Sequence, residues 1–335
     1  MAGRLAVELY YDDRPRADAL SREAVDLARA SGDPGALAAA LNARRVAIWD
    51  LAHIEERLAT AEAMIAAAEE AGEPGTVLQG RNWRVLDLME TGEVEELEAE
   101  IARYAAEADR LGLPHHRWYV PLWRAALAIL RGDAAAGAAL AEEARRLGAR
   151  AEDPNAELFV QIQRAQLLAD TGRIAEIDRS FVEGGLAASP ASWAWATWLA
   201  WMDAGLGDLD AARARIDALA PGGFAAVALD ANWHAVLDLC DAVALVGDRE
   251  RAAVLRDMLA PYAGRVGAVA RAALCYGPVD LYLARLALLC GDPQAAEAHA
   301  ARALAWCERA RAAPCLLYTS PSPRDISGSR MPSSA

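Results

Sequence analysis

The chain has 335 residues, of which 55% are hydrophobic and 24% charged, a composition typical of folded protein and not of disordered chains. All 34 basic residues are arginine, so a Walker P-loop, a kinase-type catalytic lysine and Schiff-base chemistry are excluded. The formal net charge of −14 argues against a broad basic face for a phosphate backbone, and we expect no direct nucleic-acid binding.

The two ends of the chain indicate a protein of the reducing cytoplasm. No stretch of about 18 uncharged apolar residues predicts a membrane span, and the N-terminus does not have the pattern of a signal peptide. The five cysteines form no C-x-x-C pair, and a chain of this size does not need disulfides. We therefore expect a cytoplasmic protein with no contact to a membrane.

The last residues differ in composition from the rest of the chain. Six serines occur from Cys315 onward, and the string Cys315-Leu-Leu-Tyr-Thr-Ser-Pro-Ser-Pro-Arg-Asp325 is what one reading frame of a DNA sequencing adapter would encode. We interpret residues 315–335 as a disordered, non-native tail and exclude them from the domain at 1–314. A natural Ser/Pro-rich tail is the alternative.

From the first residues onward, the chain repeats with a period of about 40 residues. Prolines recur at positions 34, 74, 114, 154 and 190, and Asp230 continues the spacing. Proline suits the first turn of a helix, where its missing N–H has no intrahelical partner, so each of these positions predicts a helix start. Subtracting one period from Pro34 places a start before Met1, so we expect the repeat domain to be truncated at both ends.

Glycines mark the turn inside each repeat. They stand at 92, 132, 172, 207, 247 and 291, and four of them precede an aspartate, which supplies a left-handed C-cap followed by an N-cap acceptor. The spacing predicts an all-α fold, a right-handed αα-superhelix of seven to eight helix hairpins similar to tetratricopeptide repeats.

Several strings within this period resemble a known family. They are His116-Arg-Trp-Tyr-Val-Pro-Leu-Trp-Arg124, Asp153-Pro-Asn-Ala156, Asp230-Ala-Asn-Trp233, Leu259-Ala-Pro-Tyr-Ala-Gly-Arg265 and the segment from Gly277 to Ala300. These strings are similar to the C-terminal helical repeats of the large bacterial STAND-type, MalT-like ATPase regulators. The resemblance covers about residues 1–314 and implies a repeat region that senses an effector or partner for an attached ATPase. In that family a LuxR- or SARP-type DNA-binding domain or a cyclase supplies the output.

The most regular polar pattern, which we name the arginine series, is Arg4, Arg44, Arg84, Arg124 and Arg164, each 40 residues after the last. On equivalent helices, these side chains could line a concave groove and bind an acidic peptide or a small anionic effector through bidentate hydrogen bonds. The alternative is that each arginine pairs with a carboxylate of a neighbouring helix and fixes the repeat interface. Candidate groove residues beside the series are Asn42, Arg81, Asn82, Tyr119, Gln161 and Gln163.

Two further segments stand out from the repeat. Trp195, Trp198 and Trp201 lie on one face of a helix, as a core stripe or as the wall of a ligand pocket. The segment from Tyr262 to Ala270 lengthens the 40-residue spacing to 44 and is either a binding loop or a long connection.

No catalytic or metal-ligating pattern emerges, and we expect neither an enzyme, a metal nor a cofactor. The adjacent His115 and His116 have no partner at helical spacing that would complete a coordination shell. The sequence favours a non-catalytic sensor or scaffold that binds a protein segment or effector, with a stand-alone adaptor as the alternative. An enzyme would need titratable residues that converge in a deep cleft.

Overall fold

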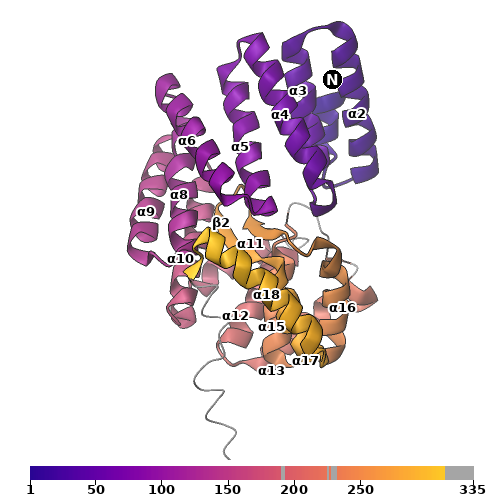
Figure 1. Ribbon diagram of the computed structural model, residues 1–335, viewed down its shortest axis with the longest axis vertical. Coiled ribbons are helices and arrows are strands. Elements are labelled where there is room, and N and C mark those ends of the chain that lie inside the picture. The colour runs from indigo at the N-terminus through magenta and orange to yellow at the C-terminus, as the bar shows by residue number, and fades with distance from the viewer. Residues whose placement is uncertain (190–192, 225, 228–231, 314–335) are drawn as a thin grey trace, which may run out of the picture.

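The computed structural model describes residues 1–189, 193–224, 226–227 and 232–313, and these are almost entirely helical (Figure 1). The all-α class is confirmed for this part of the chain, apart from one short β-hairpin. The α-helices are α1 (Ala2–Glu8), α2 (Arg14–Ser31), α3 (Pro34–Ala47), α4 (Ile54–Ala71), α5 (Pro74–Thr91), α6 (Val94–Leu111), α7 (Pro114–Arg117), α8 (Tyr119–Leu130), α9 (Ala134–Arg150), α10 (Asn155–Asp170), α11 (Arg179–Ala188), α12 (Trp193–Gly205), α13 (Leu209–Leu219), α14 (Pro221–Phe224), α15 (Ala235–Val246), α16 (Arg249–Leu259), α17 (Val279–Cys290) and α18 (Pro293–Ala310). Single 3₁₀ turns cover Leu51–His53, Ile174–Glu176 and Ala260–Tyr262.

The predicted proline and glycine positions bound the helices. Helices α3, α5 and α7 begin at Pro34, Pro74 and Pro114, and α10 begins directly after Pro154. The positions Pro190 and Asp230 lie outside the described residues. All four Gly-Asp turns have the predicted geometry, with the glycine at a φ of 76–83° and the aspartate accepting a hydrogen bond from a backbone N–H three residues on.

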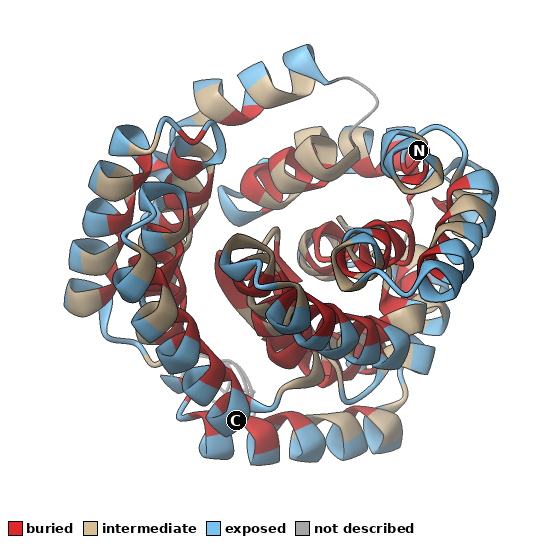
Figure 2. Cartoon of the chain, turned by 90° about the horizontal axis from the view of Figure 1, so that it is seen from above, coloured by how far each residue is buried: buried red, intermediate tan, exposed pale blue. Residues whose placement is uncertain are grey.

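Successive helices from α2 to α6 pack side by side and fill the upper half of Figure 1, and α12 to α18 fill the lower half. The outer helices carry exposed residues on their outward sides and buried residues toward the interior (Figure 2). In the lower half the simple order of neighbours changes, because α12 packs against both α13 and α15. None of the helices in the described ranges is long and apolar enough to cross a membrane.

The β-hairpin is formed by β1 (Val266–Val269) and β2 (Leu274–Pro278), which pair antiparallel with an irregularity after Gly267. It occupies part of the segment from Tyr262 to Ala270 that the sequence indicated as a loop or long connection, and that expectation is wrong for β1. Every residue of β1 is buried, so the strand is a short continuous apolar run without polar alternation. A strand buried on both faces does not have the period-two pattern that identifies strands in a sequence.

The hairpin joins the core of the N-terminal half although it comes late in the chain. One hydrophobic cluster runs through α2 to α10 and includes residues of both strands and of the end of α18. A second cluster fills the space between α12, α13, α15, α16 and α17. The hairpin therefore lies where the two halves meet, and its position holds them together (Figure 1).

Candidate functional site

Three members of the arginine series make ion pairs with carboxylates of neighbouring helices. The Arg44 side chain is 5% exposed and bonds to Glu56 at 2.7 Å and to Asp18. Arg164 bonds to Glu142 at 2.9 Å near the surface. These contacts agree with the alternative in which each arginine pairs with a carboxylate of a neighbouring helix and stabilises the packing of adjacent helices.

Arg84 and Arg81 share one carboxylate. Arg84 bonds to Glu96 at 2.7 Å and to Glu100 at 2.9 Å, and Arg81 bonds to Glu100 at 2.9 Å. The carboxylate of Glu100 is 1% exposed, so the arginines supply the charge that its burial requires. Ion pairing raises the pKa of Arg84 despite its partial burial.

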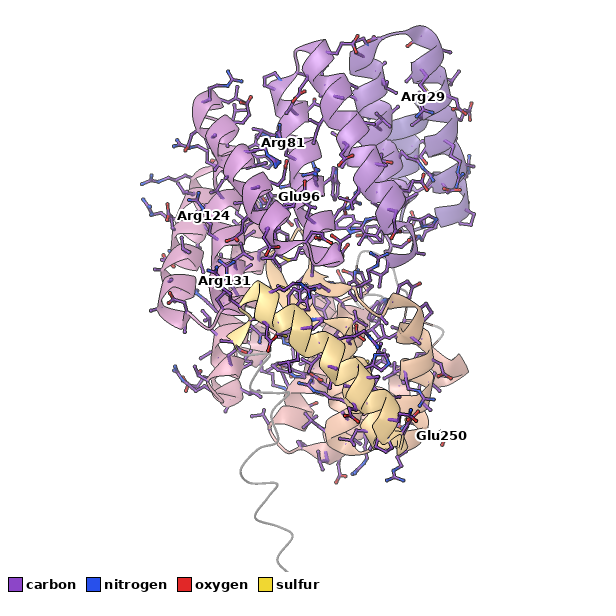
Figure 3. The ribbon with its side chains drawn as sticks, in the orientation of Figure 1. Arg29, Arg81, Glu96, Arg124, Arg131 and Glu250 are labelled. Atoms are coloured by element: carbon purple, nitrogen blue, oxygen red, sulfur yellow. The ribbon has the colours of Figure 1, made fainter. Side chains whose placement is uncertain are left out.

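The remaining candidates of the predicted groove lie in different environments. Arg4 and Arg124 are exposed, and within the described residues neither has an ion-pair partner within 4 Å. Figure 3 labels Arg124. Gln161 donates to Glu157 on its own helix. Tyr119 is 5% exposed and packs against Trp118 and Trp123, so it belongs to the core.

The residue before each later arginine faces the hairpin. We name Trp83, Trp123 and Gln163 the hairpin-contacting series. The indole Nε1 of Trp123 donates to the carbonyl oxygen of Arg271 at 2.9 Å, and Nε2 of Gln163 donates to that of Ala273 at 2.6 Å. These three residues follow the same 40-residue spacing, so the arithmetic that found the arginine series could also have found them.

Arg271 is the tip of the hairpin and lies in an aromatic and polar cage. Its guanidinium is 4.1 Å from the ring centroid of Trp83, and it donates to the side-chain oxygen of Asn82 at 3.0 Å. Desolvation lowers the pKa of Arg271. Because the chain's own hairpin occupies this side of α5, α8 and α10, Asn82 and Gln163 contact that segment.

A buried ionic cluster lies next to this cage. Asp87 accepts hydrogen bonds from Arg45 and Arg57, and Arg57 also pairs with Glu90. The indole Nε1 of Trp233 donates to Glu90 at 2.8 Å and so links the cluster to the C-terminal half. Burial raises the pKa of Glu90, and the unfavourable desolvation and the repulsion of Arg57 lower the pKa of Arg45 to about 10. The two arginines compensate the charges of the two carboxylates, so we interpret the cluster as a structural element of the fold.

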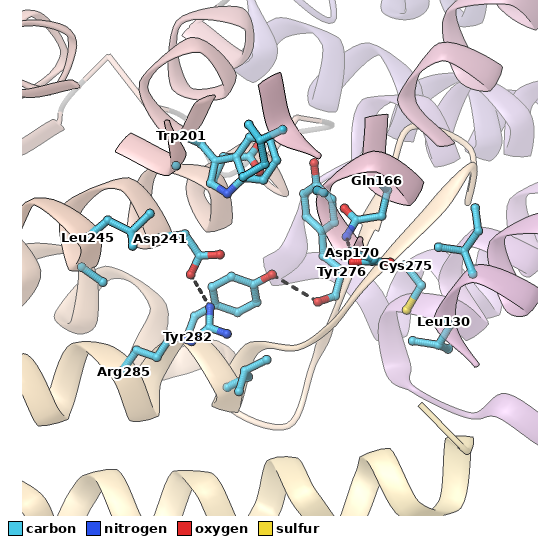
Figure 4. A pocket seen from close by; sticks show the side chains of 17 residues that line it. Leu130, Gln166, Asp170, Trp201, Asp241, Leu245, Cys275, Tyr276, Tyr282 and Arg285 are labelled. Atoms are coloured by element: carbon cyan, nitrogen blue, oxygen red, sulfur yellow. Dashed lines mark hydrogen bonds and ion pairs between the residues drawn. The ribbon is translucent and has the colours of Figure 1, made fainter. Parts of the chain in front are cut away.

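A pocket of about 500 Å³ lies between the two halves (Figure 4). Its wall comes from α8, α10, the 3₁₀ turn at Ile174–Glu176, α12, α15, β2 and α17, so it combines segments from residue 129 to residue 285. A volume of this size is in the range that holds small molecules. The polar and aromatic side chains of the wall are Gln166, Asp170, Trp201, Asp238, Asp241, Tyr276, Tyr282 and Arg285.

Several of these side chains are held by contacts with one another. Arg285 pairs with Asp241, and the Tyr282 hydroxyl donates to the backbone carbonyl of Tyr276 at 3.1 Å. Gln166 donates to Asp170 at 2.6 Å. Figure 4 shows Trp201, Asp170, Tyr276 and Tyr282 around the same space. The pocket is therefore lined by pre-positioned groups.

The environment of the pocket perturbs two of its carboxyl groups. Burial raises the pKa of Asp170, and Gln166 opposes that effect. Burial and the charge of Asp241 raise the pKa of Asp238 well above its ordinary value, and a hydrogen bond with Tyr276 opposes the shift. Perturbed carboxyl groups in a pocket mark a candidate functional site.

The sequence pointed to one wall of this pocket. Of the three candidate tryptophans Trp201 lines this pocket, whereas Trp195 and Trp198 do not. All three are partly buried and pack against one hydrophobic cluster, and Trp195 stacks on Trp198. The acids Asp170 and Asp238 were missed, because they lie 68 residues apart and outside any shared register. Only the packing of α10 on one side and α15 on the other brings them to one space.

Comparisons with known proteins add no assignment, since no protein-family model, curated protein or solved structure matches the chain.

Proposed function

We propose that this chain is a non-catalytic sensor module, a right-handed αα-superhelix of about seven to eight helix hairpins whose central pocket holds an effector. The observation that carries the proposal is the composition of the pocket wall. Helices α8 and α10 come from the N-terminal half, and α12, α15, β2 and α17 come from the C-terminal half. A ligand there touches both halves, and any preference it has for one packing of the halves shifts their equilibrium.

The hairpin supplies a connection between the pocket and the rest of the molecule. Cys275 and Tyr276 of β2 line the pocket, and the tip at Arg271 is held by Asn82 and Trp123. A change in β2 therefore reaches α5 and α8 through directly bonded residues. Such a contiguous element supports a sensor more than a passive spacer.

The resemblance to the repeats of STAND-type, MalT-like regulators supports the same proposal. In that setting the module senses an effector in the cytoplasm on behalf of an ATPase domain in a longer protein. Arg124 is exposed and has no ion-pair partner within the described residues, and we propose it as the main contact to a protein segment of a partner. Arg164 and Gln161 lie near the solvent beside it, and a partner would compete there with Glu142 and Glu157. Arg44, Arg81 and Arg84 are already engaged by carboxylates of this chain.

Binding explains the pocket better than chemistry does. Asp241 is neutralised by Arg285, and the Tyr282 hydroxyl is committed to a backbone carbonyl. Groups fixed in this way orient a ligand, whereas a nucleophile needs a base within hydrogen-bond reach. The titratable groups nevertheless converge in a cleft, so the test below includes a search for turnover.

The test blocks the pocket at its mouth. Leu245 lines the pocket and is 54% exposed, and Leu288 has a similar exposure but does not line it. We expect a panel of small metabolites of all charge types, measured by ligand-observed NMR, to contain compounds that bind the wild type and Leu288→Trp but not Leu245→Trp. Absence of any compound with this pattern contradicts the proposed sensor, and conversion of a bound compound to a product makes the chain an enzyme.

A further inference from the structure

We infer that the ligand of the central pocket is a small organic cation, an ammonium or guanidinium compound that carries an apolar group. The inference rests on the proposed function, because it names the chemical class of the effector that the pocket holds. It is carried by three features of the wall: its balance of charges, its aromatic rings and its size.

The charged side chains of the wall are mostly acidic. Three carboxylates, Asp170, Asp238 and Asp241, face the pocket together with one guanidinium, Arg285. Arg285 bonds to Asp241. When all three carboxyl groups are ionised, the wall therefore has two more negative than positive charges, on side chains that are only partly exposed to water. A bound cation supplies the missing positive charge, whereas an anion adds to the repulsion.

The apolar and aromatic part of the wall suits the rest of such a ligand. The rings of Trp201, Tyr276 and Tyr282 line the same space as the acids (Figure 4). Aromatic faces attract ammonium and guanidinium groups and pack against aliphatic or aromatic substituents. Ile129 and Leu130 extend this apolar surface on the side of α8.

This conclusion reverses the charge expected from the arginine series. That series suggested an anionic effector, but Arg44, Arg84 and Arg164 bond to carboxylates of neighbouring helices outside the pocket. The carboxyl groups that have no arginine partner in the pocket wall, Asp170 and Asp238, line the pocket instead. The effector is thus recognised by carboxylates.

The raised pKa values of Asp170 and Asp238 give the inference a second readout. A carboxyl group that is protonated in the empty pocket must ionise to pair with a cation, so binding releases protons into the buffer. Affinity for a cation then rises with pH through the raised pKa values. The titratable and charged groups that face this space are Asp170 from α10, Asp238 and Asp241 from α15, Cys275 and Tyr276 from β2, and Tyr282 and Arg285 from α17.

The experiment uses matched probes that differ in charge. Isothermal titration calorimetry on the full chain compares phenethylamine with 2-phenylethanol and 3-phenylpropanoate, and choline with its neutral isostere 3,3-dimethylbutan-1-ol. We expect at least one of the two cations to bind, with its neutral and anionic partners weaker by about tenfold or more. Repeating the titration in two buffers of different ionisation enthalpy measures the proton release, and we expect tighter cation binding at pH 8 than at pH 5.5.

One double variant and a control place the binding in the pocket. The double variant Asp170→Asn/Asp238→Asn keeps the shape of protonated carboxyl groups, so it is expected to fold, to lose about tenfold or more in cation affinity and to release no protons. Asp257→Asn removes a carboxylate that is 77% exposed and does not line the pocket, and the variant is expected to have the affinity of the wild type.

Each outcome separates this inference from the proposed function. If only neutral or anionic probes bind, and Leu245→Trp abolishes that binding, the cation inference is overturned while the proposed sensor function is retained. Cation binding that survives in Asp170→Asn/Asp238→Asn overturns the inference in the same way. If no probe of any charge type binds in a way that Leu245→Trp abolishes, the proposed function itself is overturned.

Discussion

The arginine series and the hairpin-contacting series lie one residue apart on the same helices and share one 40-residue spacing, yet they do different things. Trp83, Trp123 and Gln163 are buried against the hairpin, whereas Arg84 and Arg164 reach carboxylates near the surface. One residue along a helix is a rotation of about 100°, which is enough to move a side chain from the interior to the rim. Spacing therefore shows that positions are equivalent, and the packing decides what they contact.

The same contrast holds for two adjacent arginines. Arg44 pairs with Asp18 and Glu56, whose carboxylates are 39% and 44% exposed. Arg45 pairs with Asp87, and both side chains are fully buried. Water screens the first set of ion pairs and cannot reach the second, so substitutions in the two sets must differ in cost. The predictions below test that difference.

The largest effect is expected at the centre of the buried ionic cluster. Asp87→Asn leaves Arg45 and Arg57 without their shared carboxylate, and we expect the free energy of unfolding to fall by about 3–5 kcal/mol. Glu56→Gln removes a half-exposed partner of Arg44, and a loss of about 1 kcal/mol or less is expected. Urea unfolding of both variants measures the difference, and equal losses would mean that burial does not separate the two arginines.

A pH-dependent effect is expected from His234, a buried residue at the start of α15. Its exposed fraction is 8%, and burial lowers its pKa from 6.5 to about 4. The folded state therefore holds a neutral imidazole, whose contribution to stability is complete above pH 6.5 and is lost as the pH falls toward 4. The shift corresponds to roughly 3 kcal/mol.

His234→Gln tests this expectation, because glutamine cannot take up a proton. We expect the variant to lose less stability than the wild type between pH 7 and pH 4, as measured by urea unfolding at each pH. His115→Gln serves as the control, since the His115 side chain is 61% exposed. If His234→Gln has the same pH dependence of stability as the wild type, protonation of His234 does not contribute to the loss of stability in acid.

A smaller effect is expected where the hairpin-contacting series holds the tip. Trp123→Phe removes the indole N–H that donates to the carbonyl of Arg271, and we expect a loss of about 1–2 kcal/mol beyond the change in packing. Trp198→Phe removes the same atoms at a site where, within the described residues, no hydrogen bond of the indole nitrogen occurs. We expect the larger loss at Trp123, which has both the hydrogen bond and the greater burial, and equal losses in the two variants would show that the hydrogen bond adds nothing.

The contrast also explains what could be predicted from the sequence. Helix starts at Pro34 and Pro74 and turns such as Gly132-Asp133 are local, because their backbone preferences act within one or two turns. The hairpin has no local signal, since β1 is apolar throughout and its partners lie on α5 and α8. The pocket has even less, because Asp170 and Asp238 meet only through the packing of distant helices. Local sequence patterns therefore predict individual helices and turns, whereas contacts between the two halves require the three-dimensional structure.

The smallest effects are expected along the arginine series itself. Arg84→Gln breaks pairs with Glu96, which is 50% exposed, and with the buried Glu100, which keeps Arg81 as a partner. We expect a loss of about 1 kcal/mol that shrinks in high salt, because the outer pair is screened. Arg164→Gln breaks one pair between half-exposed side chains, and its melting midpoint is expected to equal that of the wild type. A loss at Arg164 as large as that of Asp87→Asn would show that exposure does not weaken the Arg164–Glu142 pair and would erase the distinction between the two series.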